Sequence, residues 1–491
     1  MNLTDLYTIV PPLILVAGAI VTLMADLAVP RENKAITAWL AIVVYILSLV
    51  SLGFLWGLGI AGLHGFGGMV ILDSYALFLD GLFASIGITT ILLTFRYNPE
   101  RGIVRGEFYP LLLLSTAGMM LMAHAMNLLI VFLAIELLSF PLYILCGIAR
   151  PRVDSEESSL KYFLLGAFAS GFLVYGIALI YGATGTIQLT ELAQKVSSGT
   201  LPSSLLLYAG IGLILVGLSF KVAAVPFHMW TPDVYEGAPT TVTGFMATAT
   251  KAAGFAAVVR VFLFGLAPLI ATWQPAIVTL SALTMIVGNV VALSQTNLKR
   301  MLAYSSIAHA GYVLIGVAAG NPLGATGILF YLVSYAVTTL AAFAVMTVMG
   351  TSAGEDQSID AYAGLARRKP WLAIVMALAM FSLTGVPPTA GFAGKYFLFQ
   401  AAVASGLTWL AVLGVLTSVI SAYFYLRVVV VMFMREPDTK PVPLSVTDGA
   451  RSIAITFSAL ATLLLGIIPS PLLGIVGQAV SALTGSGHLP G

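Results

Sequence analysis

Long apolar runs separated by short polar connections make up almost the whole chain. A helix needs about 20 mostly apolar residues to cross a bilayer, and on that basis the pattern predicts about fourteen spans. Their approximate bounds are 9–29, 36–58, 70–94, 108–124, 126–148, 160–182, 204–229, 240–265, 271–294, 302–319, 325–349, 371–401, 407–434 and 450–474. The pattern therefore predicts an all-α polytopic membrane protein.

Two of these runs are long and contain prolines near their middle. Pro226 interrupts 204–229, and Pro387 and Pro388 interrupt 371–401. Proline removes a backbone donor and its ring clashes with the preceding turn. Each run is therefore counted as one broken span.

The basic residues indicate an orientation. The connections after even-numbered spans hold only Lys195 and Arg260, and those after odd-numbered spans hold Arg31, Lys34, Arg96, Arg101, Arg105, Arg150, Arg152, Lys299, Arg300, Arg367, Arg368, Lys369, Arg435, Lys440 and Arg451. Because basic connections stay in the cytoplasm, we expect both termini on the outer face. The connection after the seventh span carries Asp233 and Glu236 instead, and we expect an ordered, buried turn there.

The order of the spans predicts an internal repeat. Spans four to eight and nine to thirteen each have a broken helix in fourth place, and an odd number of spans inverts the second copy. The predicted divisions are a three-span segment, two inverted five-span repeats, and a final span with its tail. Their bounds are 1–107, 108–270, 271–435 and 436–491.

Composition narrows the class of protein. Hydrophobic residues make up 59% of the chain and charged residues 9%, whereas soluble domains have about 25% charged residues. The single cysteine, Cys146, excludes disulfides, cysteine-ligated iron–sulfur clusters and structural zinc within this chain. No close histidine pair predicts a metal site, and no basic cluster predicts nucleic-acid binding.

Lysines inside the apolar runs are the strongest functional signal. Lys221, Lys251 and Lys395 have no acidic neighbour in the sequence. A charge at the bilayer centre costs about 2.5 kcal/mol or more, and such residues usually mark ion or proton pathways. Lys221 and Lys395 also lie beside the proline breaks, as is typical of transport proteins. Snorkelling to the interface fits Lys221 poorly, because it lies deep in its span.

Glu136 is the one acidic residue well inside a span, and it would either hold a proton or seek a cation. We interpret it as a proton site; the alternative is a structural pair that ties two helices together. Glu157 and Lys161 are spaced i, i+4 and share a helix face. They form either a surface pair or a route by which Lys161 reaches Glu136.

Two histidines on apolar helices are secondary candidates. His228 lies two residues after Pro226, at the break, and this position favours a relay role. For His309, a hydrogen-bonded core histidine and a functional group are both open.

Three segments carry a family resemblance. Residues 226–240 read PFHMWTPDVYEGAPT and lead to KAAGF at 251–255. Residues 297–312 read NLKRMLAYSSIAHAGY, and residues 385–395 read GVPPTAGFAGK. These motifs resemble the antiporter-like subunits of respiratory complex I, and TPDVYEG resembles the N type, called subunit 2 in mitochondria.

The resemblance implies a fourteen-helix fold with inverted repeats and one proton channel within a proton-pumping NADH:quinone oxidoreductase. It pairs Glu136 with Lys221, places Lys251 and His228 on the central polar axis, and puts Lys395 on the exit side. It also implies that this chain binds no cofactor, while NADH, FMN, iron–sulfur clusters and quinone belong to other subunits. The implied partners are the neighbouring membrane-arm subunits and the lipid bilayer.

Three functions compete. The motif TPDVYEG favours a complex I subunit over an Mrp-type cation/proton antiporter, which shares the fold and the charged axis. A membrane scaffold without transport would leave the buried lysines unexplained. The expected location is a bacterial plasma membrane, which is the inner membrane if the host is Gram-negative.

Overall fold

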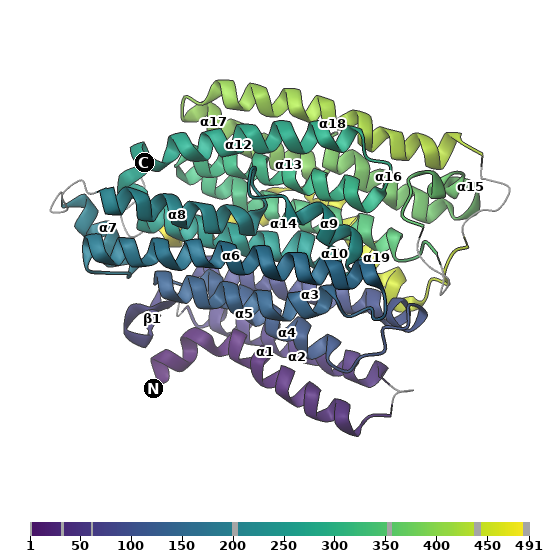
Figure 1. Cartoon of the computed structure of the whole chain (residues 1–491), viewed down its shortest axis with the longest axis horizontal. Helices are drawn as coiled ribbons and strands as arrows, with labels where there is room; N and C mark the ends of the chain where they lie inside the picture. Colours follow the sequence, from purple (N-terminus) through teal and green to yellow (C-terminus); the bar gives the residue numbers. More distant parts are fainter. Residues whose placement is uncertain are drawn as a thin grey trace.

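The computed structural model describes residues 2–30, 34–59, 62–198, 205–350, 356–436 and 443–484. It is a bundle of long helices that run side by side (Figure 1). Arg31 and Lys440, two of the residues behind the predicted orientation, lie outside the described residues.

The helices of the first half are α1 (Leu3–Ala28), α2 (Ala35–Gly57), η2 (Phe66–Gly68), α3 (Ser74–Glu100), α4 (Phe108–His124), α5 (Leu128–Cys146), α6 (Val153–Thr184), α7 (Leu189–Ser197), α8 (Leu205–Val222), α9 (Trp230–Gly237), α10 (Thr240–Phe245), η3 (Met246–Thr250), α11 (Lys251–Val258) and η4 (Val259–Gly265). Those of the second half are η5 (Ala267–Leu269), α12 (Ile270–Leu293), α13 (Leu298–Ala319), α14 (Pro322–Met346), η6 (Asp360–Tyr362), α15 (Leu365–Arg368), α16 (Pro370–Thr384), α17 (Ala390–Ala404), α18 (Thr408–Met434), α19 (Gly449–Ile467) and α20 (Ser470–Thr484).

The predicted polytopic fold is confirmed. Within the described residues, 12 helical segments are long and apolar enough to cross a membrane, and α4, α16 and α20 are shorter apolar helices. Two features were not predicted. A short antiparallel hairpin pairs β1 (Leu63–Gly65) with β2 (Val70–Leu72), and the final span is followed by α20, which packs on α3 and α14.

Both predicted helix breaks are confirmed. The helix of the seventh span, α8, stops at Val222 before Pro226, and the next helix, α9, begins at Trp230 in the connection predicted after that span. Inside that break, the backbone N–H of Val225 donates to Thr284 Oγ1 of α12 at 2.9 Å. The twelfth span stops at Thr384, and the next residue is Gly385 with φ 93°, a left-handed value at which glycine has no steric penalty. Irregular backbone at membrane depth is tolerated where protein surrounds it.

Three adjacent segments form the enclosed centre of the bundle. The apolar stretch of Thr240–Gly265, which comprises α10, η3, α11 and η4, is 100% buried, and those of α13 and α14 are 94% and 89% buried. The outer helices α1, α6, α12, α18 and α19 have less than half of their apolar stretch buried. Lys251 begins α11, so it lies in the most enclosed part of the protein.

Candidate functional site

Lys221 lies on α8 at the edge of the first break and is bonded only to hydroxyl groups among the described residues. Its Nζ donates to Ser139 Oγ of α5 at 2.8 Å and to Tyr162 OH of α6 at 3.0 Å. The ammonium also lies 5.4 Å from the centre of the Tyr162 ring, within range of a cation–π contact. The side chain is 4% exposed, so solvent does little to stabilise its charge.

Glu136 lies on the same face of α5, one turn before Ser139. Its carboxylate accepts a hydrogen bond from Ser170 Oγ of α6, and no ion pair within the described parts of the chain joins it to Lys221. A cavity of about 10 Å³ is lined by Ser139, Ser170 and Lys221, close to the smallest space that holds one water. A water there would connect the serine partners of the two charged groups. Their coupling stays a prediction.

Lys251 and His309 meet in the enclosed centre. Lys251 Nζ donates to the backbone carbonyl of Ser306 on α13 and lies 5.7 Å from the centre of the Tyr335 ring. His309 follows Ser306 by one turn, and its ring centre is 5.1 Å from that of Tyr335. The imidazole hydrogen-bonds to the hydroxyl of Tyr331 and, at 3.0 Å, to that of Tyr425. His309 is thus a hydrogen-bonded core histidine that also adjoins the lysines.

Lys395 extends this arrangement to the second break. Its Nζ donates to the carbonyls of Leu383 and Thr384 at 3.1 and 2.9 Å and to Ser418 Oγ at 3.0 Å. Both carbonyls belong to the last turn of α16, where helical backbone lacks partners and carries partial negative charge. The ammonium lies 4.6 Å from the Tyr312 ring centre. The break therefore supplies the polar groups that hold Lys395.

Aromatic rings link the two central groups to Lys395. The His309 ring is 5.6 Å from that of Tyr312, which in turn underlies Lys395. We call Lys221, Lys251, His309 and Lys395 the lysine line. His228 lies apart from it: the residue is half-buried between α8 and α9, and its Nδ1 has no hydrogen-bond partner among the described residues.

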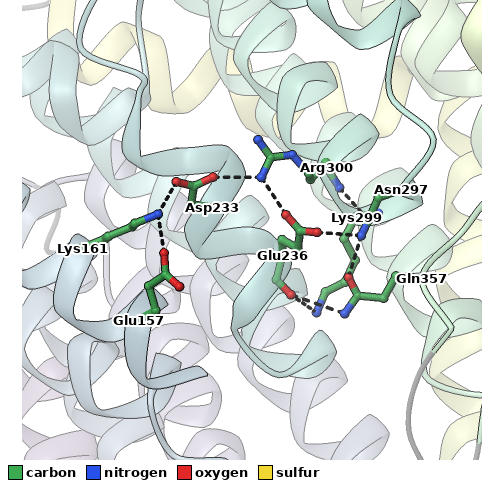
Figure 2. Close-up of polar contacts among 8 residues, drawn as sticks. All are labelled: Glu157, Lys161, Asp233, Glu236, Asn297, Lys299, Arg300 and Gln357. Atoms are coloured by element: carbon green, nitrogen blue, oxygen red, sulfur yellow. Dashed lines mark hydrogen bonds and ion pairs between the residues drawn. The ribbon is translucent and has the colours of Figure 1, made fainter. Parts of the chain in front are cut away.

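A polar recess of about 880 Å³ opens at one end of the bundle, and Figure 2 shows the ion pairs along it. Lys161 Nζ contacts Glu157 Oε1 and Asp233 Oδ2, each at 2.7 Å. Arg300 Nη1 contacts Asp233 Oδ1 at 2.8 Å and Glu236 Oε2 at 2.6 Å. Lys161 therefore takes part in the surface pair with Glu157, extended to Asp233, and makes no described contact with Glu136.

Asp233 is the centre of these recess ion pairs. Burial opposes ionisation of its carboxyl, but hydrogen bonds from Lys161 and Arg300 outweigh burial and lower the pKa of Asp233 below its ordinary value. The acids were expected in an ordered, buried turn. The segment is ordered as α9, yet the Asp233 side chain is 36% exposed, because the segment lines an open recess.

Sequence reasoning missed two buried pairs of an acidic and a basic residue at the opposite end of the bundle. Arg260, which had been assigned to a connection, is 1% exposed and makes two 2.7 Å hydrogen bonds to Asp73. Asp80 and His124 are both fully buried and 2.8 Å apart. Asp73 and Asp80 are seven residues apart in an apolar run, and this spacing, which puts both on one helix face, was the available signal.

Comparisons with known proteins identify close relatives. The family described as "NADH:quinone oxidoreductase/Mrp antiporter, TM" matches residues 125–421. The protein named NADH-quinone oxidoreductase subunit N of Chloroflexus aggregans is 47% identical over 98% of each chain. The protein of the same name in Trichlorobacter lovleyi is 44% identical, also over 98% of each chain.

Solved structures with a similar fold include chains of two membrane complexes. A chain of respiratory complex I from Thermus thermophilus is 36% identical, with a TM-score of 0.80 over 94% of this chain and 98% of that one. A chain of the Mrp complex from Dietzia is 22% identical, with a TM-score of 0.81 over 98% of both chains. At that identity the second likeness concerns the fold alone.

Proposed function

Because the chain belongs to the subunit N family of NADH-quinone oxidoreductases, we propose that it forms one proton-translocation channel in the membrane arm of complex I. Electron transfer from NADH to quinone takes place in other subunits, which hold FMN and the iron–sulfur clusters. This chain binds no cofactor and contributes the coupled movement of protons.

The lysine line is the observation that carries this proposal. Lys221, Lys251 and Lys395 are each less than 5% exposed, and their described hydrogen bonds go to hydroxyl and carbonyl oxygens. A buried ammonium held only by neutral groups is not fixed in its charged form by a carboxylate. Hydroxyl and imidazole groups beside it are able to pass protons along.

The recess is proposed as the entrance for protons. The basic connections predict that this end of the bundle faces the cytoplasm of a bacterial cell, with the chain in the plasma membrane and both termini outside. Glu157 and Asp233 at the recess supply carboxylates near the start of α6 and α9. From there, Tyr162 on α6 leads to Lys221.

An Mrp-type antiporter is the second candidate, because the same fold occurs in the Mrp complex. The two functions differ in what drives transport. A complex I subunit moves protons only while quinone is reduced, whereas an antiporter exchanges sodium for protons in the absence of NADH. A sodium pulse given to vesicles without NADH therefore separates them.

Lys251→Ala in the intact complex tests the proposal. Inverted membrane vesicles supplied with NADH should lose most of their proton uptake, since a missing proton carrier slows transfer about a hundredfold or more. Lys34→Ala is the matched control, because Lys34 is paired with Asp26 near the end of α1. Normal proton uptake by an assembled Lys251→Ala complex would overturn the proposal.

A further inference from the structure

The buried pair Asp80–His124 ties three helices together at the end of the bundle that carries the β1–β2 hairpin. His124 ends α4, Asp80 lies on α3, and Thr8 lies on α1. The imidazole contacts Asp80 Oδ2 through Nε2 at 2.8 Å and the backbone carbonyl of Thr8 through Nδ1 at 3.0 Å. None of the three side chains is exposed.

The hydrogen bonds fix how many protons the pair holds. A carbonyl oxygen only accepts, so His124 Nδ1 carries the hydrogen that binds Thr8. The contact between Nε2 and Oδ2 needs one further hydrogen, because two bare acceptors 2.8 Å apart would repel. The pair is therefore either a neutral acid beside a neutral imidazole or a carboxylate beside an imidazolium. Both forms have the same proton count and no net charge.

One atom of the pair remains open to another proton. Asp80 Oδ1 is buried and has no hydrogen-bond partner in the described structure, although buried carboxyl oxygens are normally bonded. A proton that binds Oδ1 produces a neutral acid that still accepts the hydrogen bond of a His124 imidazolium. The existing contact between Oδ2 and Nε2 is then kept.

Further polar groups lie near the pair, on α1 and on its own helix α3. Thr8 Oγ1 donates to the backbone carbonyl of Asp5 at 2.8 Å. Asp5 is half-buried and lies one turn closer to the N-terminus of α1. Asp73, two turns from Asp80 on α3, binds Arg260. Arg260 lies on the same continuous helical segment as Lys251. These are the charged groups that α1, α3 and η4 present at this end.

We propose that Asp80 and His124 form a second protonatable site, separate from the lysine line, which exchanges a proton with the aqueous phase at the hairpin end. The proton binds at Asp80 Oδ1. The added positive charge is unfavourable in a buried site, so the pair passes the proton on. This inference rests on the proposed function, since it gives proton translocation an additional group at the face opposite the recess.

Asp73–Arg260 provides the contrast that separates exchange from a purely structural tie. Both Asp73 oxygens are bonded to Arg260, Arg260 Nε donates to the Ala123 carbonyl at 3.0 Å, and the guanidinium stacks 4.5 Å from the Tyr75 ring centre. That pair has no open carboxyl oxygen. Asp80 has one.

Infrared spectroscopy of the intact complex tests this site directly. The carboxyl stretching region is recorded from about pH 8 to about pH 5. We expect wild type to show a pH-dependent carboxyl band that Asp80→Asn loses. Asp26→Asn, which removes a carboxylate of a peripheral ion pair, should retain it. Identical titrations of wild type and Asp80→Asn would overturn the proposal.

A second variant covers the case in which Asp80→Asn does not assemble. His124→Gln keeps the carboxyl group but removes the imidazole, so the band should persist and titrate at a different pH. An unshifted band would also overturn the proposal. Proton uptake by Lys251→Ala separates the two ideas: continued uptake defeats the proposed function, whereas lost uptake with no Asp80 band defeats only the second site.

Discussion

The recess and the lysine line hold their charges in opposite ways. In the recess, Lys161 and Arg300 each contact two carboxylates, and the lysine side chain is 41% exposed. On the lysine line, Lys251 and Lys395 are buried and bonded to carbonyl and hydroxyl oxygens. Opposite charge and water fix the protonation state of the recess groups. The lysines of the lysine line make no ion pair within the described residues and are each less than 5% exposed.

This difference supports the roles proposed for the two regions. Ion pairs near water contribute little stability, about 0–1 kcal/mol, but they keep their groups ionised over a wide pH range. A buried lysine amine bonded to neutral groups shifts between its charged and neutral forms when its electrostatic surroundings change. The recess thus offers an open, charged entrance whose groups keep their charges, and the lysine line is suited to transfer protons.

Glu136→Gln should have the largest effect among the changes that sharpen this comparison. Glu136 is an acid whose charge acts on Lys221, and a hydrogen bond to a charged group contributes about 1.5–3 kcal/mol. We expect proton pumping and quinone reduction to fall together by about tenfold, with the complex still assembled. Ser170→Ala, which removes the bond to Glu136, should give a smaller loss in the same direction. Wild-type turnover in assembled Glu136→Gln would exclude a role for this carboxylate.

Pro226→Ala should have an intermediate effect. Alanine restores a backbone donor at the first break, which favours helix and tightens the segment after Lys221. Proton transfer should slow severalfold, with a near-normal amount of complex in the membrane. Thr284→Val removes the hydroxyl that binds the Val225 N–H and should disturb the same break from the α12 side. If neither variant changes proton pumping, the break has a structural role and no role in proton transfer.

Asp233→Asn should have the smallest effect. The side chain is more than a third exposed, so solvent screening limits the lost ion pairs to about 0.2–1 kcal/mol. Because the pKa of Asp233 is lowered in the folded protein, its stabilisation is complete above the ordinary value of about 3.9 and disappears as pH falls through the lowered pKa. The thermal unfolding temperature of the purified complex should therefore be lower for Asp233→Asn than for wild type at neutral pH, and the two should be equal in strong acid. Asp154→Asn removes a looser ion pair of 3.3 Å and should lower the unfolding temperature less. If Asp233→Asn lowers the unfolding temperature equally at every pH, this account is contradicted.

Much of the fold follows from the sequence because the bilayer imposes simple rules. Apolar runs of spanning length became helices, and Pro226 and Pro387 fell within breaks, where a missing backbone donor disrupts no helical hydrogen bond. The lysines were found because charge inside an apolar run is rare. The division into inverted repeats, at residues 108–270 and 271–435, stays a prediction.

Other parts of the site depend on contacts between distant segments. Asp73 and Arg260 are 187 positions apart, and each lies near a span end, so neither appeared buried. The tyrosines along the lysine line gave no signal, because Tyr312 and Tyr335 resemble ordinary core residues in an apolar helix. The hydroxyl partners of Lys221 come from two other helices. Their proximity to Lys221 is visible only in the folded structure.

The central claim, that buried lysines transfer protons, is tested most directly at Lys395. Arginine keeps a positive charge but does not release its proton at any working pH. Proton uptake driven by NADH should be measured in inverted vesicles that contain Lys395→Arg or Lys395→Ala in the assembled complex. We predict that both variants lose pumping to a similar degree. Full pumping by Lys395→Arg would contradict the claim and make Lys395 a fixed charge held by the end of α16.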